Sequence, residues 1–190
     1  MHIFFFNSSG RKDTIIYSTG TAFAALMLDG SVVTWGHSMF GGDSSSVQVD
    51  LKKGVVKTIY STYTAFAALM LDGSVVTWGH AGWGGDSSSV QVDLKKGVVK
   101  TIYSTYTAFA ALMLDGSVVT WGHADMGGNS SRVQAELKGV KTIYSTRGAF
   151  AALKSDESVV TWGDAGGDSS TVQAQLKGVK TIYSNTAAFA

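Results

Sequence analysis

The stretch AFAALMLDGSVVTWGH, residues 65–80, decides the fold because it recurs along the chain. The same sixteen residues begin at Ala22 and at Ala108, and a diverged copy, AFAALKSDESVVTWGD, begins at Ala149. The tryptophans of the four copies are separated by 43, 43 and 41 residues: Trp35, Trp78, Trp121 and Trp162. A period in this range is typical of propellers, solenoids and other arrays in which each repeat buries its core against its neighbours.

Within one repeat, the residue pattern predicts three strands joined by short turns. Residues 55–61 (VVKTIYS) are rich in β-branched and aromatic residues and predict the first strand. Residues 65–71 are continuously apolar and rich in alanine, which favours a second strand buried on both faces. The Asp72-Gly73 pair predicts a two-residue hairpin turn with positive φ. Residues 74–79 (SVVTWG) then form the return strand, which carries Trp78.

This pattern also identifies the residues that we expect to be structural. The four tryptophans are expected in the core, between neighbouring repeats. The turn glycines occupy one position in three repeats: Gly30, Gly73 and Gly116. The fourth repeat has Glu157 at this position, which we expect to weaken its hairpin because glycine adopts positive φ at no steric cost.

A glycine-rich loop and the segment SSSVQVDLKKG, residues 87–97, follow the third strand. The segment fits either a short outer strand or a short helix. We favour one or two helical turns, because Ser88–Gln91 fits a capping box and Gly97 suits a helix end. The later copies, residues 130–139 and 169–178, have Ala in place of Val, which predicts that they are more helical.

Composition restricts the functional class. The chain has 190 residues and a formal net charge of +1, and 15% of its residues are charged, against about 25% in typical domains. With 45% hydrophobic residues it has enough apolar material for a packed core. The near-neutral balance removes the electrostatic case for a nucleic-acid or anionic-membrane partner. Without cysteine, disulfides and thiolate zinc sites are excluded.

The sequence predicts no targeting or membrane segment. The apolar run near the N-terminus is shorter than the roughly 7–15 residues of a signal-peptide core, and residues 65–71 fall short of the about 20 that cross a bilayer. We therefore expect a cytoplasmic protein by default. The sequons at Asn7 and Asn129 matter only in a secreted one.

Residues 56–85, VKTIYSTYTAFAALMLDGSVVTWGHAGWGG, resemble the repeat of the RCC1-like family (regulator of chromosome condensation). In that family a V-x-x-I start leads to A-L, D-G, V-x-x-W-G and a glycine-rich loop. Ten residues match these positions without a gap: Val56, Ile59, Ala68, Leu69, Asp72, Gly73, Val75, Trp78, Gly79 and Gly84. The resemblance covers about residues 14–190 and implies a β-propeller built from successive repeats.

The chain departs from that family in the length and number of its repeats. Residues 1–13 form a lead-in, and residues 14–190 hold four repeats of about 39–43 residues and a partial fifth. The family's repeats are longer and usually seven in number, so one chain cannot close the usual ring. We expect an all-β tandem-repeat array of three- to four-stranded units, β-propeller-like, with room for one short helix per repeat. An open β-solenoid is the alternative fold, and the family's exchange-factor activity is not carried over.

The loop after each Trp-Gly pair holds the candidate functional residues. Histidines occupy the same position in three repeats: His37, His80 and His123. They could line a metal or anion site if the loops converged, but Asp164 replaces them in the fourth repeat and no second ligand follows at metal-binding spacing. We therefore expect no metal and no other cofactor.

Large apolar side chains in the same loops vary between repeats: Met39, Phe40, Trp83 and Met126. Variable loops on a rigid array commonly carry binding, which predicts a recognition surface. The alternative is drift at a tolerant loop, with these side chains folded back onto the neighbouring repeat.

We expect a protein with no catalytic residues, because nearly identical repeats supply the same side chains again rather than a unique catalytic set. The favoured function is a scaffold that binds a protein partner. The first alternative is a self-assembling structural protein whose end strands, residues 2–6 and 179–190, pair head to tail. The second is a carbohydrate- or small-ligand-binding propeller that uses the Trp, His and Asp of its loops.

Overall fold

The computed structural model describes residues 3–4 and 14–190. It divides into two compact parts, an N-terminal half (Met1–Ser87) and a C-terminal half (Ser88–Ala190), which are described separately. Each half holds two antiparallel sheets, so that the expected all-β array of three-stranded meanders is confirmed. None of the helices in these ranges combines the length and the hydropathy that a bilayer crossing requires.

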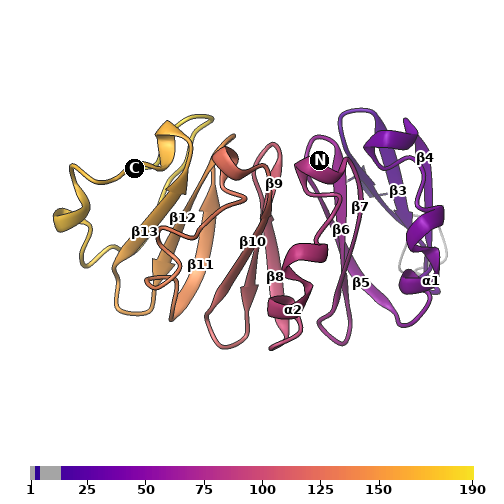
Figure 1. Ribbon diagram of the computed structural model, residues 1–190, viewed down its shortest axis with the longest axis horizontal. Coiled ribbons are helices and arrows are strands. Elements are labelled where there is room, and N and C mark those ends of the chain that lie inside the picture. Colours follow the sequence, from indigo (N-terminus) through magenta and orange to yellow (C-terminus); the bar gives the residue numbers. More distant parts are fainter. Residues whose placement is uncertain (1–2, 5–13) are drawn as a thin grey trace. The chain divides into compact units, whose positions relative to one another are not determined.

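The N-terminal half contains the first two sheets (Figure 1). The first sheet has the order β1-β2-β3-β4: β1 (Ile3–Phe4), β2 (Ile15–Ser18), β3 (Ala22–Leu26) and β4 (Val32–Gly36). The second has the order β5-β6-β7: β5 (Val56–Ser61), β6 (Ala65–Met70) and β7 (Val75–Gly79). Short helices follow the third strands: η1 (Ser38–Phe40), η2 (Ser45–Val47), α1 (Gln48–Leu51) and η3 (Ala81–Trp83).

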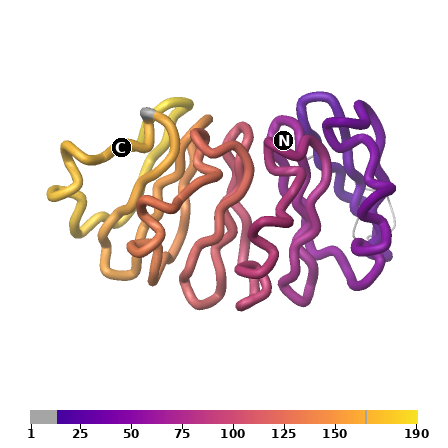
Figure 2. The backbone as a smooth tube through the Cα atoms, viewed as in Figure 1, coloured from indigo at the N-terminus to yellow at the C-terminus, as the bar shows by residue number. Residues whose placement is uncertain are grey.

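The C-terminal half repeats this arrangement. Its strands are β8 (Val99–Ser104), β9 (Ala108–Met113), β10 (Val118–Gly122), β11 (Val140–Ser145), β12 (Ala149–Lys154) and β13 (Val159–Gly163). Its helices are η4 (Ser88–Val90), α2 (Gln91–Leu94), η5 (Ala124–Met126), η6 (Ala165–Gly167) and η7 (Gln173–Gln175). Beyond η7 the backbone forms no named strand, and one bridge joins Ser184 to Phe189 in the part coloured yellow in Figure 2.

The N-terminal strand has a partner within its own sheet. Ile3 and Phe4 of β1 pair with Ile16 and Ile15 of β2, so β1 extends the first sheet by a fourth strand. We expected residues 2–6 to have no partner inside their own repeat, and this is wrong for Ile3–Phe4. Residues 2 and 5–6, and the sequon at Asn7, lie outside the described residues.

The Asp-Gly hairpins are three-residue turns and not the two-residue turns that the sequence suggests. The Met70 N–H donates to the Ser74 carbonyl at 2.9 Å, and the Gly73 N–H donates to the Met70 carbonyl at 3.1 Å. Gly73 has a φ of 84°, whereas Asp72 keeps a negative φ. This is the turn in which a type I bend is followed by one left-handed residue.

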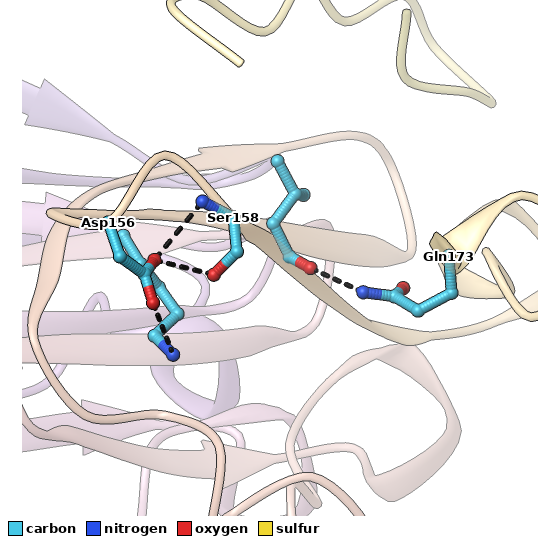
Figure 3. A network of polar contacts seen from close by, with 5 residues as sticks. Asp156, Ser158 and Gln173 are labelled. Carbon is cyan, nitrogen blue, oxygen red and sulfur yellow. Dashed lines mark hydrogen bonds and ion pairs between the residues drawn. The ribbon is translucent and has the colours of Figure 1, made fainter. Parts of the chain in front are cut away.

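The turn aspartates explain this geometry, as the fourth repeat shows in Figure 3. Asp156 Oδ1 accepts hydrogen bonds from the Ser158 hydroxyl at 2.6 Å and from the Ser158 backbone N–H at 3.1 Å. Four aspartates make this pair of bonds to the serine two residues on: Asp29, Asp72, Asp115 and Asp156. The serine hydroxyl, followed by the serine N–H, lowers the pKa of each carboxyl. The aspartates are thus turn residues.

The expected short helix is α-helical after the first two sheets, and the fourth copy has one 3₁₀ turn, η7, at the equivalent place. In α1 and α2, the Lys52 and Lys95 N–H groups reach back four residues to Gln48 and Gln91, both at 3.1 Å. The proposed capping box is wrong, because α2 begins after Val90 and has no side-chain cap.

The expectation that the later copies are more helical is also wrong. Residues 131–136 are turns, and the Leu137 N–H reaches back three residues to Gln134 at 3.3 Å. These copies reach the next repeat through KGV, where the earlier copies have KKGVV. The shorter connection makes the chain leave the helical path sooner, which outweighs the better helix propensity of alanine.

In the N-terminal half the two sheets pack through faces of opposite character. The first sheet contributes small side chains and one tyrosine, which we call its alanine face: Tyr17, Ala22 and Ala24. The second contributes a stacked ring pair and its neighbours, which we call its aromatic face: Ile59, Phe66, Ala68 and Trp78. Small side chains on one face thus lie opposite large ones on the other, which lets two layers pack closely.

The C-terminal half repeats this packing between the third and fourth sheets. The third sheet presents the alanine face, with Ala108 and Ala110, and the fourth presents the aromatic face, with Ile143, Phe150 and Trp162. The alternation along each strand produces both faces at once, because successive side chains point to opposite sides.

A loop glycine completes each of these contacts. Gly41, at a φ of 99°, lies directly over Phe66, where a Cβ would approach the ring to 2.5 Å. Its carbonyl accepts a hydrogen bond from Trp78 Nε1 at 3.1 Å. In the C-terminal half, the Gly127 carbonyl accepts one from Trp162 Nε1 at 3.0 Å. Each of these buried indole N–H groups therefore finds its acceptor in the loop of the preceding repeat.

The four tryptophans differ in burial although their sequences are the same. Trp78 is 3% exposed, and Trp121 and Trp162 are also buried. Trp35 is 43% exposed, so the expectation of a core residue is wrong at this position. The reason is that, within the described part of the chain, no alanine face covers the aromatic face of the first sheet.

The first prediction compares two tryptophans at one repeat position. Trp78→Ala should lower the free energy of unfolding by about 3–5 kcal/mol, because it empties a buried site and removes the bond to Gly41. Trp35→Ala should cost about 1 kcal/mol or less, because its ring is half exposed. Urea unfolding followed by circular dichroism measures both losses. Small and equal losses would contradict the packing described above.

The second prediction concerns the fourth hairpin. Glu157 has a φ of 66°, at the position where Gly30, Gly73 and Gly116 have values of 82° to 84°. Glu157→Gly should raise the free energy of unfolding by about 1 kcal/mol, because it removes the steric cost of a left-handed residue with a Cβ. The matched control is Gly116→Glu, which should be destabilising. A neutral or destabilising Glu157→Gly in urea unfolding would contradict this account.

The third prediction follows from the lowered aspartate pKa values. A carboxyl with a lowered pKa in the folded state stabilises the fold above its unfolded pKa of 3.8, and this stabilisation is lost as the pH falls through the folded value. Stability should therefore fall below about pH 4. Asparagine at Asp29, Asp72, Asp115 and Asp156 should reduce this loss, because its amide oxygen accepts without titrating, as Asn129 does for the Ser131 N–H at 2.9 Å. Urea midpoints at pH 7 and pH 3 test this, and an unchanged acid dependence in the variant would refute it.

Candidate binding rim

The loops that carry the candidate residues lie at the end of each sheet opposite the Asp-Gly turns. Each loop begins with a backbone bond to the turn between the first two strands of its own sheet: His37 N–H to Thr21, His80 to Thr64, His123 to Thr107 and Asp164 to Gly148, at 3.0–3.1 Å. We call these loops and turns the rim of each half. The first residue of each loop is thus held to its own sheet by a backbone hydrogen bond.

Threonine hydroxyls fix the rest of each loop. Thr62 Oγ1 donates to the Trp83 carbonyl at 3.2 Å, and Thr105 Oγ1 donates to the Met126 carbonyl at 2.9 Å. Thr19 makes the same bond to Phe40 at 3.2 Å. Three repeats therefore hold this loop by the same threonine hydroxyl.

In the N-terminal half, the rim brings four of the predicted residues into one row of rings. The ring centroids of His37 and Phe40 are 4.5 Å apart, and those of His80 and Trp83 are 4.9 Å apart. Phe40 and His80 link the two pairs at 6.2 Å. Met39, which is 63% exposed, belongs to the same loop. The rings are thus held in place by one another and by the loop backbone.

Tyr63 joins this surface from the turn between β5 and β6. It is partly exposed, and its ring lies over Gly20, where a Cβ would collide with it. The Gly20 N–H donates to the Tyr63 carbonyl at 2.8 Å, which ties the turns of the two sheets together.

In the C-terminal half, the rim has a different chemical character. The Arg147 guanidinium lies 4.7 Å from the centre of the Tyr106 ring, and the Tyr106 N–H donates to the Arg147 carbonyl at 2.8 Å. The side chain of Met126 is half-buried and reaches Gly148, where a Cβ would meet its sulfur at 2.8 Å. Met126 therefore follows the alternative expectation, in which the side chain folds back onto the neighbouring repeat.

The histidines do not form a metal site in the part of the chain that the structure describes. No group of three or more side chains that could hold a metal ion is found there. His37 and His80 are joined through the ring of Phe40, and His123 belongs to the C-terminal half. The histidines of the N-terminal half thus contribute ring surface to the rim.

Sequence reasoning missed Tyr63, Tyr106 and Arg147. The signal that could have found them is the same variation between repeats that pointed to the loops. The residue two places before each second strand is Gly20, Tyr63, Tyr106, Arg147 and Thr186 in successive repeats. This position varies within segments that are otherwise nearly constant.

No family model and no curated protein sequence matches the chain. Solved structures do match its fold, at low sequence identity. Prp20p from Saccharomyces cerevisiae, the yeast RCC1, is 19% identical with a TM-score of 0.56, over 79% of this chain and 44% of Prp20p. Human WBSCR16 is 17% identical with a TM-score of 0.51, over 83% of this chain and 49% of that protein. The ectodomain of the Physcomitrella patens receptor kinase CR4 is 16% identical with a TM-score of 0.52, over 85% and 44%.

These matches bear out the resemblance seen in the repeats: the chain has an RCC1-like, β-propeller-like fold. It spans less than half the length of each of the three proteins. At these identities, the likeness extends to the fold alone.

Proposed function

We propose that this chain is a non-catalytic scaffold that binds a protein partner through its rim. The observation that carries the proposal is the row of rings formed by His37, Phe40, His80 and Trp83. Aromatic side chains held rigidly at a surface bury a large area on binding at little entropic cost, and they dominate protein interfaces. Met39 adds an exposed, adaptable apolar side chain to this row.

The distribution of variation supports a binding function. The strands are nearly the same in every repeat, whereas the residues at the rim differ: Ser38-Met39-Phe40, Ala81-Gly82-Trp83 and Ala124-Asp125-Met126. A constant framework that carries variable loops is the usual arrangement of a recognition surface.

The repeated aspartates support a non-catalytic function. The lowered pKa values of Asp29, Asp72, Asp115 and Asp156 follow from their bonds to the turn serines. A shifted pKa marks a catalytic group only where the local structure gives no simpler cause. In the four hairpins, the turn is that cause.

The proteins with this fold give a precedent for a protein partner. Prp20p is described by its binding to Gsp1p and histones, and it has also been crystallised with Kap60. Those partners belong to Prp20p. For this chain we propose a protein ligand with an exposed apolar or aromatic side chain that packs against the row of rings.

The experiment is a peptide-display selection on the intact chain, followed by affinity measurement of the enriched peptides. A rim variant with Met39→Ser, Phe40→Ser and Trp83→Ser should bind them at least about tenfold more weakly, because a few aromatic anchors carry most of the affinity. The matched control is Val49→Ser, which removes an exposed apolar side chain from α1, away from the rim.

Two outcomes would contradict the proposal. One is a selection that enriches no peptide, and the other is a set of peptides that bind the rim variant as tightly as the native chain. A glycan array on the same proteins separates the alternative function. Glycan binding that is lost in the rim variant would replace the protein partner by a carbohydrate.

A further inference from the structure

The contact between alanine face and aromatic face occurs inside each half, and both of its surfaces recur at the ends of the chain. In the N-terminal half, Ala22 and Ala24 cover Phe66 and Trp78. Phe66 is fully buried there and Trp78 nearly so. The residues of this internal contact can be compared with those on the two terminal surfaces.

The first sheet presents the aromatic face at its surface. Phe23 and Trp35, on β3 and β4 (Figure 1), correspond to Phe66 and Trp78, and their rings stack in the same way, 5.3 Å apart against 5.2 Å. Phe23 is nevertheless 39% exposed. Three further side chains of this sheet are exposed to a similar or greater degree: Met27, Val33 and Trp35.

Within the described residues, Trp35 also lacks the polar partner that Trp78 and Trp162 have. Trp78 and Trp162 donate to a glycine carbonyl of the preceding repeat. Among the described residues, no acceptor is found for the Trp35 N–H. This face therefore has the composition and ring geometry of an internal contact surface without its covering layer.

At the other end, residues 179–190 present an alanine face. Val179, Ile182 and Phe189 pack on the fourth sheet, as their equivalents do in complete repeats. Tyr183 then points away from that contact and is 73% exposed. Ala188 and Ala190, on the same side of the segment by alternation, are exposed as well.

These three residues occupy the repeat positions of the internal alanine face. In sequence register, Tyr183 corresponds to Tyr17, Ala188 to Ala22 and Ala190 to Ala24. The segment is held in hairpin form, since the Tyr183 N–H donates to the Ala190 carbonyl at 2.7 Å and the Ala190 N–H donates back at 2.8 Å. The chain thus presents at its C-terminal end the side chains that cover an aromatic face elsewhere.

We infer that the exposed aromatic face of the first sheet binds the Tyr183–Ala188–Ala190 surface of a second copy of this chain, head to tail. The contact repeats between chains the packing that joins neighbouring repeats within one. It is a heterologous contact, so it closes a ring of several copies or propagates as a filament. It uses sheet faces and not strand edges, which differs from the pairing of end strands expected from the sequence.

The strength of this contact is limited by the residues that the surface offers. The Tyr183–Ala188–Ala190 surface holds no glycine that corresponds to Gly41, so Trp35 is covered in this contact without the hydrogen bond that Trp78 donates. We therefore expect association that depends on protein concentration. It does not depend on the proposed binding by the ring row, because His37, Phe40, His80 and Trp83 belong to neither surface.

Sedimentation velocity on the intact chain over a range of concentrations tests the inference. Trp35→Arg should abolish association by placing a charge on the aromatic face, and Ala188→Arg should abolish it from the other surface. Leu28→Arg is the control, because Leu28 is 62% exposed in the turn of the same first sheet and lies outside the contact. It should associate as the native chain does. Urea unfolding of each variant verifies that it is folded.

Mixing the two arginine variants gives the decisive result. Each variant retains the surface that the other has lost, so an equimolar mixture should form a dimer and nothing larger. A native chain that stays monomeric at every concentration would overturn the inference. Association that is lost with Trp35→Arg but kept with Ala188→Arg would also overturn it, since the aromatic face would then pair with itself. Neither result bears on peptide binding at the rim, which the rim variant tests separately.

Discussion

The structure depends on one contact, in which a phenylalanine–tryptophan pair is covered by two alanines and a loop glycine of the preceding repeat. Phe66 and Trp78 fill the layer between two sheets only because Ala22 and Ala24 opposite them are small. The glycine brings the backbone close to the ring and provides a carbonyl for the indole N–H. Alanine therefore recurs for its size, glycine for its missing side chain and tryptophan for its combination of ring and donor.

This contact also determines where function can lie. The strand residues of the second, third and fourth sheets are largely buried, and an aspartate and a serine hold each hairpin turn through hydrogen bonds, so most changes at these positions reduce stability. The loops after each third strand are constrained mainly through their backbones, by threonine hydroxyls such as that of Thr62. Their side chains are left to vary, as are those of the turns between the first and second strands. This is why the ring row of the N-terminal half and the Tyr106–Arg147 pair of the C-terminal half differ in chemistry.

Much of the fold could be predicted because its determinants are local. Alternation along the strands and a glycine after Asp72 specify three strands and a turn wherever they occur. The length of that turn could not be predicted, because it depends on the bonds that the Asp72 carboxylate makes to Ser74. The later copies form no α-helix because the connection that follows them is shorter. Helix propensity alone does not predict this outcome. Of the rim, the sequence indicated the loop residues but not Tyr63, which a neighbouring turn adds.

The exposure of Trp35 could not be predicted from the sequence for a different reason. Trp35 and Trp78 lie in segments of identical sequence, so no property of the segment can explain why one is half exposed and the other buried. The difference comes from the neighbouring sheet, because in an array each repeat buries its core against its neighbours. Since the repeats are nearly identical, the exposed aromatic face of the first sheet has the same residues as the aromatic faces that are buried inside each half. Its exposure is therefore the observation from which the contact with a second copy is inferred.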